Sequence, residues 1–154
     1  MDMMQQMNAK LGSQGAALDA DAARAIARIA KPPPAASYAR LGMVFGNEEY
    51  PDAPLKNPIN DATAVGGSLR RTRCWDVTTG LNQTGDVMFG TWRGFVDKVR
   101  PGDAVLLYFA GHGCEFESKN YLLPLDFPQD ERDLPRKSLN LHDMLEELSR
   151  KQVI

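Results

Sequence analysis

The sequence has few of the features that mark secreted, membrane-spanning or nucleic-acid-binding proteins. It contains only two cysteines, Cys74 and Cys114, which excludes a disulfide framework and makes a reducing, cytoplasmic location the expectation. No apolar run approaches the roughly 18 residues that a membrane helix needs, and the N-terminus lacks the apolar core of a secretory signal. The formal net charge is -2 and no dense Lys/Arg cluster occurs, so neither nucleic acid nor a membrane is expected as a partner.

What is present is the composition of an ordinary globular domain. Of 154 residues, 43% are apolar and 25% are charged, which is enough for one compact domain with a buried core. No Cys/His spacing resembles a zinc site, so no metal or other cofactor is expected. Residues 1–37 are predicted to be a disordered tail, a short alanine-rich helix over 17–30 and a proline-rich linker. The domain itself is predicted over residues 38–154.

Strand and helix patterns alternate along this domain. Short apolar runs predict strands over 40–46 and 104–110, and residues that favour strands predict another over 74–80. Residues 152–154 look like the beginning of a further strand. Apolar residues at helical spacing predict helices over 60–72, 86–99 and 140–151, with Asn60 and Asn140 as N-caps of the first and last. This order implies right-handed βαβ units, hence an α/β fold of three layers, α/β/α, around a mostly parallel sheet.

The most informative candidate is His112, which follows the apolar strand 104–110 and has a glycine on each side. Functional sites of such sheets form beyond the carboxyl ends of the strands. A histidine there can act as a general base or activate a thiol, and the Gly113 N–H could point at a developing oxyanion. The alternative is a loop histidine whose glycines serve only the turn.

Other candidates have strong structural explanations. Asp61 lies in the first turn of a predicted helix, where an acid complements the macrodipole; alternatively its carboxylate receives a basic substrate side chain. Cys114 is close to His112, but two residues on one short loop rarely present their side chains in line for thiol activation. Cys74 opens a predicted strand and is expected in the core.

Five segments, taken in order, resemble the caspase-like cysteine peptidases (peptidase C14 family), and most of all the bacterial caspase-like and metacaspase branch. They are LGMVFGNEEY, LKNPINDA, FVDKVRPGDAVLLYFAGHG, KNYLLPLDF and LHDMLEEL. The resemblance covers nearly the whole domain and implies a p20-type catalytic domain that cleaves peptide or protein substrates with a Cys-His dyad. His112 would be the catalytic histidine, and Gly113 would contribute its backbone N–H to the oxyanion hole. Asp61 would line a pocket for a P1 Arg or Lys.

One part of the family pattern is not found. The nucleophile of the family is a cysteine in an Asp-x-Cys motif at the end of the next strand, and no Asp-x-Cys occurs in the sequence. The resemblance therefore implies an incomplete domain whose C-terminal strands are missing, and the 154 residues alone are expected to be inactive. Calcium dependence occurs in the family, but no motif here indicates it.

Two other interpretations stay open. The first is a non-catalytic caspase-like module that binds partners through its N-terminal helix or through an exposed sheet edge. The second is an unrelated flavodoxin-like domain with a ligand site at Gly46–Asn47, although no phosphate-loop or dinucleotide fingerprint supports it.

Overall fold

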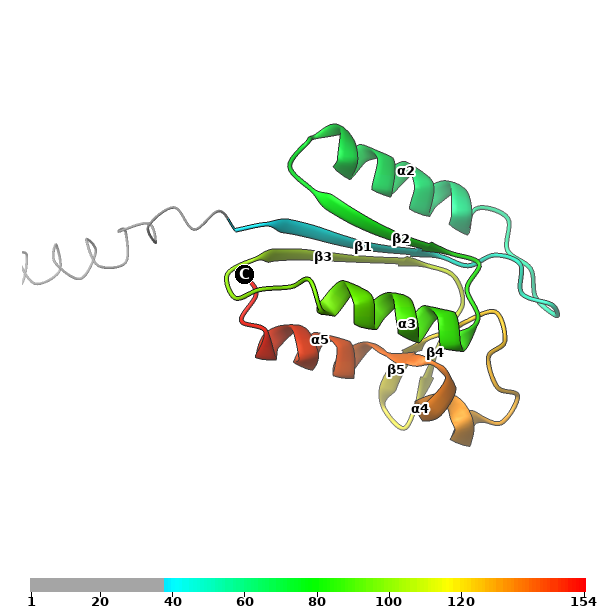
Figure 1. The fold of residues 1–154 in the computed structure, drawn as a ribbon. Helices are drawn as coiled ribbons and strands as arrows, with labels where there is room; N and C mark the ends of the chain where they lie inside the picture. Colours follow the sequence, from blue (N-terminus) through cyan, green and yellow to red (C-terminus); the bar gives the residue numbers. More distant parts are fainter. Residues whose placement is uncertain (1–37) are drawn as a thin grey trace, which may run out of the picture. The chain divides into compact units, whose positions relative to one another are not determined.

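The structure is a computed structural model that describes residues 38–154, and they form an α/β domain around a short parallel sheet (Figure 1). Three strands, β1 (Arg40–Gly46), β2 (Asp76–Leu81) and β3 (Ala104–Ala110), pair in the order β2-β1-β3. Both pairings are parallel. The carboxyl ends of the three strands therefore lie at one edge of the sheet, where the loops that follow them can meet.

Helices cover both faces of this sheet. On one face α2 (Pro58–Arg71) packs close to β1, since a Cβ at Gly42 would already lie 3.4 Å from the Leu69 side chain. On the other face lie α3 (Gly85–Val96) and α5 (Leu141–Arg150), whose apolar residues join the main core. Figure 1 shows α2 on one side of the strands and α3 with α5 on the other. The predicted three-layer α/β/α arrangement is confirmed.

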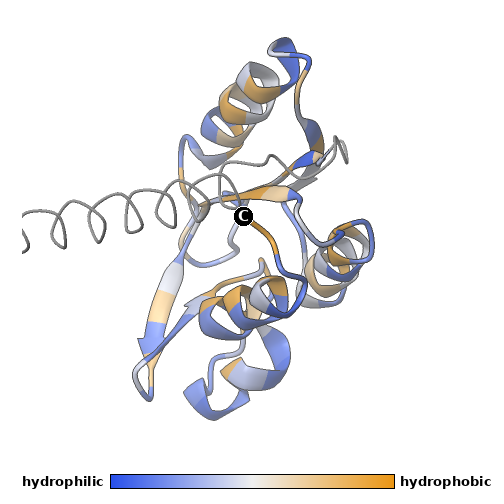
Figure 2. Cartoon of the chain, turned by 90° about the vertical axis from the view of Figure 1, so that its left-hand side faces the viewer, coloured by the Kyte–Doolittle hydropathy of each residue, from blue (hydrophilic) through white to orange (hydrophobic). Residues whose placement is uncertain are grey.

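The main core forms because β1 alternates its side chains between the two helical layers. Leu41, Met43 and Phe45 all face the layer of α3 and α5. Their partners are apolar residues at helical spacing: Met88, Trp92, Phe95, Met144 and Leu148. Figure 2 shows the consequence along the helices, where apolar and polar residues occupy different sides. None of the helices in residues 38–154 has the length and apolar character required to cross a membrane.

A second, antiparallel sheet follows β3 and was not predicted from the sequence. It contains β4 (Gly113–Phe116), β5 (Lys119–Leu122) and the two-residue β6 (Leu139–Asn140), in that order. The β4–β5 turn places Glu117 and Ser118 at positive φ, without the Asn or Gly that marks such turns in a sequence. The short helices η1 (Glu131–Asp133) and α4 (Leu134–Lys137) lead from β5 to β6.

Three local predictions are wrong. Residues 152–154 contain a turn instead of a strand, and Gln152 has a φ of 57°. Asn60 is not the N-cap of α2, because the helix begins at Pro58 and the Glu48 carboxylate accepts a hydrogen bond from the Ile59 N–H (3.0 Å). Cys74 precedes β2 and is exposed instead of lying in the core.

The last predicted helix is confirmed together with its cap. The Asn140 side chain accepts hydrogen bonds from the N–H groups of His142 (2.9 Å) and Asp143 (3.3 Å), which satisfies two of the four unpaired donors at the start of α5. The tail, helix and linker predicted over residues 1–37 lie outside the described residues.

Candidate active site

His112 lies directly beyond the carboxyl end of β3, and its backbone is tied to two other segments. Its N–H donates to the Tyr50 hydroxyl (3.0 Å), and its carbonyl accepts from the Leu123 N–H (3.0 Å). The Tyr50 hydroxyl donates in turn to the Leu123 carbonyl (2.9 Å). Three hydrogen bonds among three residues therefore set the backbone position of the histidine.

Gly111 is required because the chain passes very close to Tyr50. A Cβ on residue 111 would lie 2.7 Å from the Tyr50 hydroxyl and 2.8 Å from the Phe109 ring. Tyr50 is only 1% exposed, so it has no room to retreat. The first glycine of the GHG motif therefore keeps the tyrosine hydroxyl within reach of the His112 N–H.

The imidazole of His112 is oriented by the loop that follows β1. Its Nε2 atom lies 2.7 Å from the carbonyl oxygen of Ala53, and the ring packs against the Tyr50 ring at a centroid distance of 4.5 Å. A carbonyl oxygen can only accept a hydrogen bond, so Nε2 carries the proton in this contact. The other nitrogen, Nδ1, then holds the lone pair and can take a proton from a neighbouring group.

The backbone N–H of Gly113 points away from the neighbouring strand. Gly113 lies opposite Leu122 in the β4–β5 ladder, and the adjacent pair, His112 and Leu123, is joined by a hydrogen bond. Hydrogen-bonded and non-hydrogen-bonded pairs alternate in an antiparallel ladder. The pair of Gly113 and Leu122 is therefore a non-hydrogen-bonded pair. Because β4 has no other strand partner within residues 38–154, this N–H is directed at the outer side of the sheet.

Asp61 lies at the same edge of the parallel sheet as His112. It is an exposed residue in the first turn of α2, and that turn packs on Gly46, where a Cβ would lie 2.7 Å from the Cβ of Ala62. No hydrogen bond or ion pair joins the Asp61 side chain to another residue of the described chain. Its carboxylate is therefore open to solvent and to a ligand.

Neither cysteine is placed to act with His112 as a nucleophile. Cys114, on β4, packs against the apolar cluster that contains Tyr50 and Tyr121. Burial, with a smaller contribution from the Glu131 carboxylate, raises the pKa of the Cys114 thiol, so the thiol is protonated at neutral pH and a weak nucleophile. Cys74 precedes β2 and so lies at the amino edge of the sheet, opposite His112.

A buried asparagine connects the loops around this edge. Asn47 follows β1 and is 0% exposed. Its Oδ1 accepts from the Gln83 N–H (3.0 Å), its Nδ2 donates to the Leu123 carbonyl (3.2 Å), and its own N–H donates to the Ala110 carbonyl (2.9 Å). These bonds use both ends of the side chain, so the ligand site at Gly46–Asn47 required by the flavodoxin-like interpretation has no support.

Two groups at this site were not singled out from the sequence: the Tyr50 hydroxyl and the Ala53 carbonyl. Asn47 was considered there only as part of a ligand site. The segment LGMVFGNEEY, one of the five that carry the resemblance, contains both Asn47 and Tyr50. No sequence pattern indicates the Ala53 carbonyl, because every residue type has a backbone carbonyl. Across residues 38–154, no three or more His, Cys, Asp or Glu side chains are grouped so that they could hold a metal ion.

Together these features define an α/β protein with an oriented histidine and an outward-directed backbone N–H at the carboxyl edge of a parallel sheet. The family model of the caspase domain, the peptidase C14 family, matches residues 39–154. The chain therefore belongs to the caspase-domain family. A search of the curated proteins found no match for it.

Proposed function

We propose that this domain supplies the histidine half of a cysteine-type endopeptidase of the metacaspase type. The observation that carries the proposal is the orientation of the His112 ring, whose Nε2–H faces the Ala53 carbonyl and whose Nδ1 is left as the base. Membership of the caspase-domain family supports peptidase chemistry and a peptide or protein substrate. A cytoplasmic location is part of the proposal and rests on the two cysteines, both unpaired.

The reaction needs a thiol beside Nδ1 of His112. Within the described residues, β3 has a strand partner on one side only, and a parallel strand added on the other side would end at the same edge as His112. A cysteine at the end of such a strand is where the resemblance puts the family's Asp-x-Cys nucleophile. In this proposal the nucleophile comes from a polypeptide segment other than residues 38–154.

In each half of the reaction, acylation and hydrolysis, the histidine would first accept a proton and then return it. Its Nδ1 takes the thiol proton as sulfur attacks the substrate carbonyl carbon, and the Gly113 N–H donates to the resulting oxyanion. Nδ1 then returns the proton to the leaving amine as the C–N bond breaks. Water hydrolyses the thioester in the same way, giving its proton to Nδ1, and the thiol is released when that proton returns to sulfur.

Asp61 is proposed to receive a P1 Arg or Lys side chain, because its carboxylate is exposed at the edge that holds His112. In the assembled enzyme, meaning this chain with the segment that supplies the nucleophile, Asp61→Asn should lower kcat/KM for an Arg-P1 peptide. Hydrogen bonds to charged groups contribute about 1.5–3 kcal/mol, which corresponds to roughly 10–100-fold. Initial rates with peptides carrying Arg, Lys or Asp at P1 provide the measurement.

The control is Asp86→Asn, which removes the acid from the first turn of α3. If both carboxylates act only on their helix dipoles, the two variants will have equally small effects on kcat/KM, and the substrate role of Asp61 is lost. If the assembled protein cleaves none of the three peptides, the alternative of a non-catalytic binding module is favoured, for which the open side of β3 is the supporting observation.

A further inference from the structure

A cavity of about 200 Å³ lies between α3, α4 and α5, on the face of the sheet opposite α2. Its floor includes the buried residues Trp92, Ser138 and Met144, and its rim carries charged side chains from α3 and α5. None of the candidate active-site residues lines it. The volume is below the roughly 300–1,000 Å³ of small-molecule sites, so the cavity suits one long side chain and not a nucleotide or other cofactor.

One residue of the cavity lining, Ser138, has a buried hydroxyl that lacks a partner. Ser138 is 2% exposed, and its Oγ makes no hydrogen bond with any other described residue. Its backbone N–H, in contrast, donates to the Leu134 carbonyl (2.9 Å). The hydroxyl oxygen has less than 1 Å² of accessible surface, so a group in the cavity does not reach it, and the polar contacts of a ligand come from the rim.

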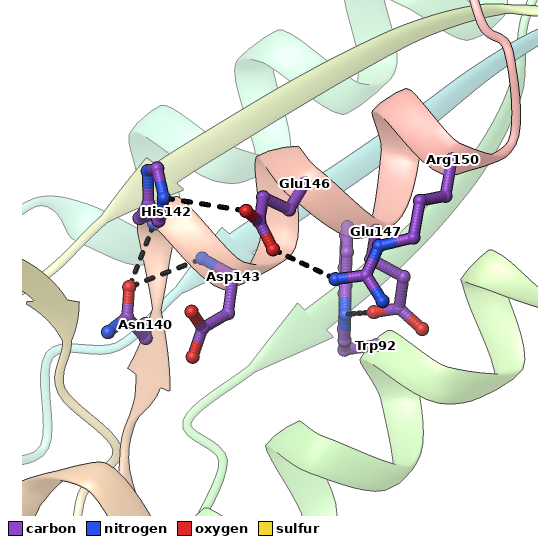
Figure 3. Close-up of polar contacts among 7 residues, drawn as sticks. All are labelled: Trp92, Asn140, His142, Asp143, Glu146, Glu147 and Arg150. Carbon is purple, nitrogen blue, oxygen red and sulfur yellow. Dashed lines mark hydrogen bonds and ion pairs between the residues drawn. The ribbon is translucent and has the colours of Figure 1, made fainter.

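The α5 side of the rim is acidic. Glu147 accepts a hydrogen bond from the Trp92 indole N–H through Oε2 (2.8 Å), which keeps its carboxylate at the cavity (Figure 3). Asp143 lines the same side, and no ion pair joins it to another residue of the 38–154 domain. Glu146, on the same helix, does not line the cavity and lies between His142 (3.8 Å) and Arg150 (2.9 Å).

We infer that this cavity is a docking site for a lysine or arginine side chain of a protein partner. The apolar floor of Trp92 and Met144 suits the methylene stem, which long basic side chains bury readily. The cationic head would find the carboxylates of Asp143 and Glu147 as acceptors, and hydrogen bonds between ionised groups are the strong ones.

The rim also favours a cation carried on a polypeptide over a free amine. The α3 side contributes Arg93, an exposed residue that makes no ion pair with another described residue. Its guanidinium would repel a second cation on that side, but it can donate to a main-chain carbonyl or to an acid beside the bound basic residue. This role needs neither a nucleophile nor the His112 site, so it is independent of the proposed peptidase activity.

Titration of the ¹⁵N-labelled 154-residue chain with the peptide acetyl-Gly-Lys-Gly-amide tests this inference. The chain has two tryptophans, Trp75 and Trp92, so two indole N–H signals are available. The Trp92 signal should shift saturably and the Trp75 signal should not. The norleucine peptide, which keeps the stem and lacks the ammonium group, should bind at least tenfold more weakly, since charge-assisted hydrogen bonds contribute about 1.5–3 kcal/mol.

Matched variants distinguish the cavity from the general charge of α5. Asp143→Asn should weaken binding of the lysine peptide, whereas Glu146→Gln should leave its Kd within about twofold. Near-UV circular dichroism checks that each variant is folded. The inference is overturned if the Trp92 signal does not shift, if norleucine binds as well as lysine, or if Glu146→Gln weakens binding as much as Asp143→Asn. Equal binding of n-butylammonium would point to a small-cation site and would also overturn the docking role.

Discussion

Replacing His112 by Ala in the assembled enzyme should lower kcat for an Arg-P1 peptide by about 10⁶-fold, the size of effect known for the base of another nucleophile-base hydrolase. The reason is that the proposed reaction transfers the thiol proton to Nδ1 of His112. Loss of the ring also leaves the Ala53 carbonyl without the donor that it faces at 2.7 Å. Single-turnover and steady-state hydrolysis of the same peptide measure the effect.

The matched control is the second histidine of the chain. His142 lies exposed on α5, and its ring nitrogen Nε2 lies 3.8 Å from the Glu146 carboxylate, so His142→Ala should leave kcat unchanged within about twofold. A loss of less than tenfold in His112→Ala would show that another group takes the thiol proton, and would remove His112 from the catalytic role.

Asn47→Ala should destabilise the domain by about 2–4 kcal/mol. The side chain is 0% exposed and bonded at both ends. Its removal leaves the part-buried Gln83 N–H without its acceptor, takes one donor from the Leu123 carbonyl and opens a small cavity. The effect should also reach the candidate active site, because Leu123 bonds both Tyr50 and His112. Urea unfolding followed by circular dichroism gives the free energy of unfolding.

The corresponding control is Asn120→Ala, an asparagine exposed on β5. It should change the free energy of unfolding by no more than about 0.5 kcal/mol. If Asn47→Ala is as mild as this control, the three loops are held by other contacts, and the buried asparagine is not what positions the histidine backbone.

The sequence was sufficient for the parallel sheet because β1 and β3 are short, continuous apolar runs and the segment before the end of β2 is rich in residues that favour strands. The run at 104–110 could be assigned without ambiguity, and His112 followed from its position after that run, since the carboxyl edge of a parallel sheet is where loops gather. Asn140 could be predicted as a cap because a helical pattern begins directly after it.

The remaining features depend on contacts between distant parts of the chain. Nothing local to α2 indicates that Glu48, 11 residues before Ile59, caps its first turn. The β4–β5 hairpin turns through Glu117 and Ser118 at positive φ, which are not residues that mark such a turn. The orientation of His112 depends on the Ala53 carbonyl, 59 residues away in the chain, and a backbone group has no signature in a sequence.

The central claim is that His112 is held as a base with its lone pair on Nδ1, and long-range ¹H–¹⁵N correlation spectra of the imidazole measure this directly. At a pH where the ring is neutral, the bond to the Ala53 carbonyl predicts that His112 carries its proton on Nε2 and that Nδ1 has the chemical shift of an unprotonated nitrogen. The exposed His142 provides the internal reference for a mixture of tautomers. A proton on Nδ1 of His112, or a tautomer mixture equal to that of His142, would contradict the claim.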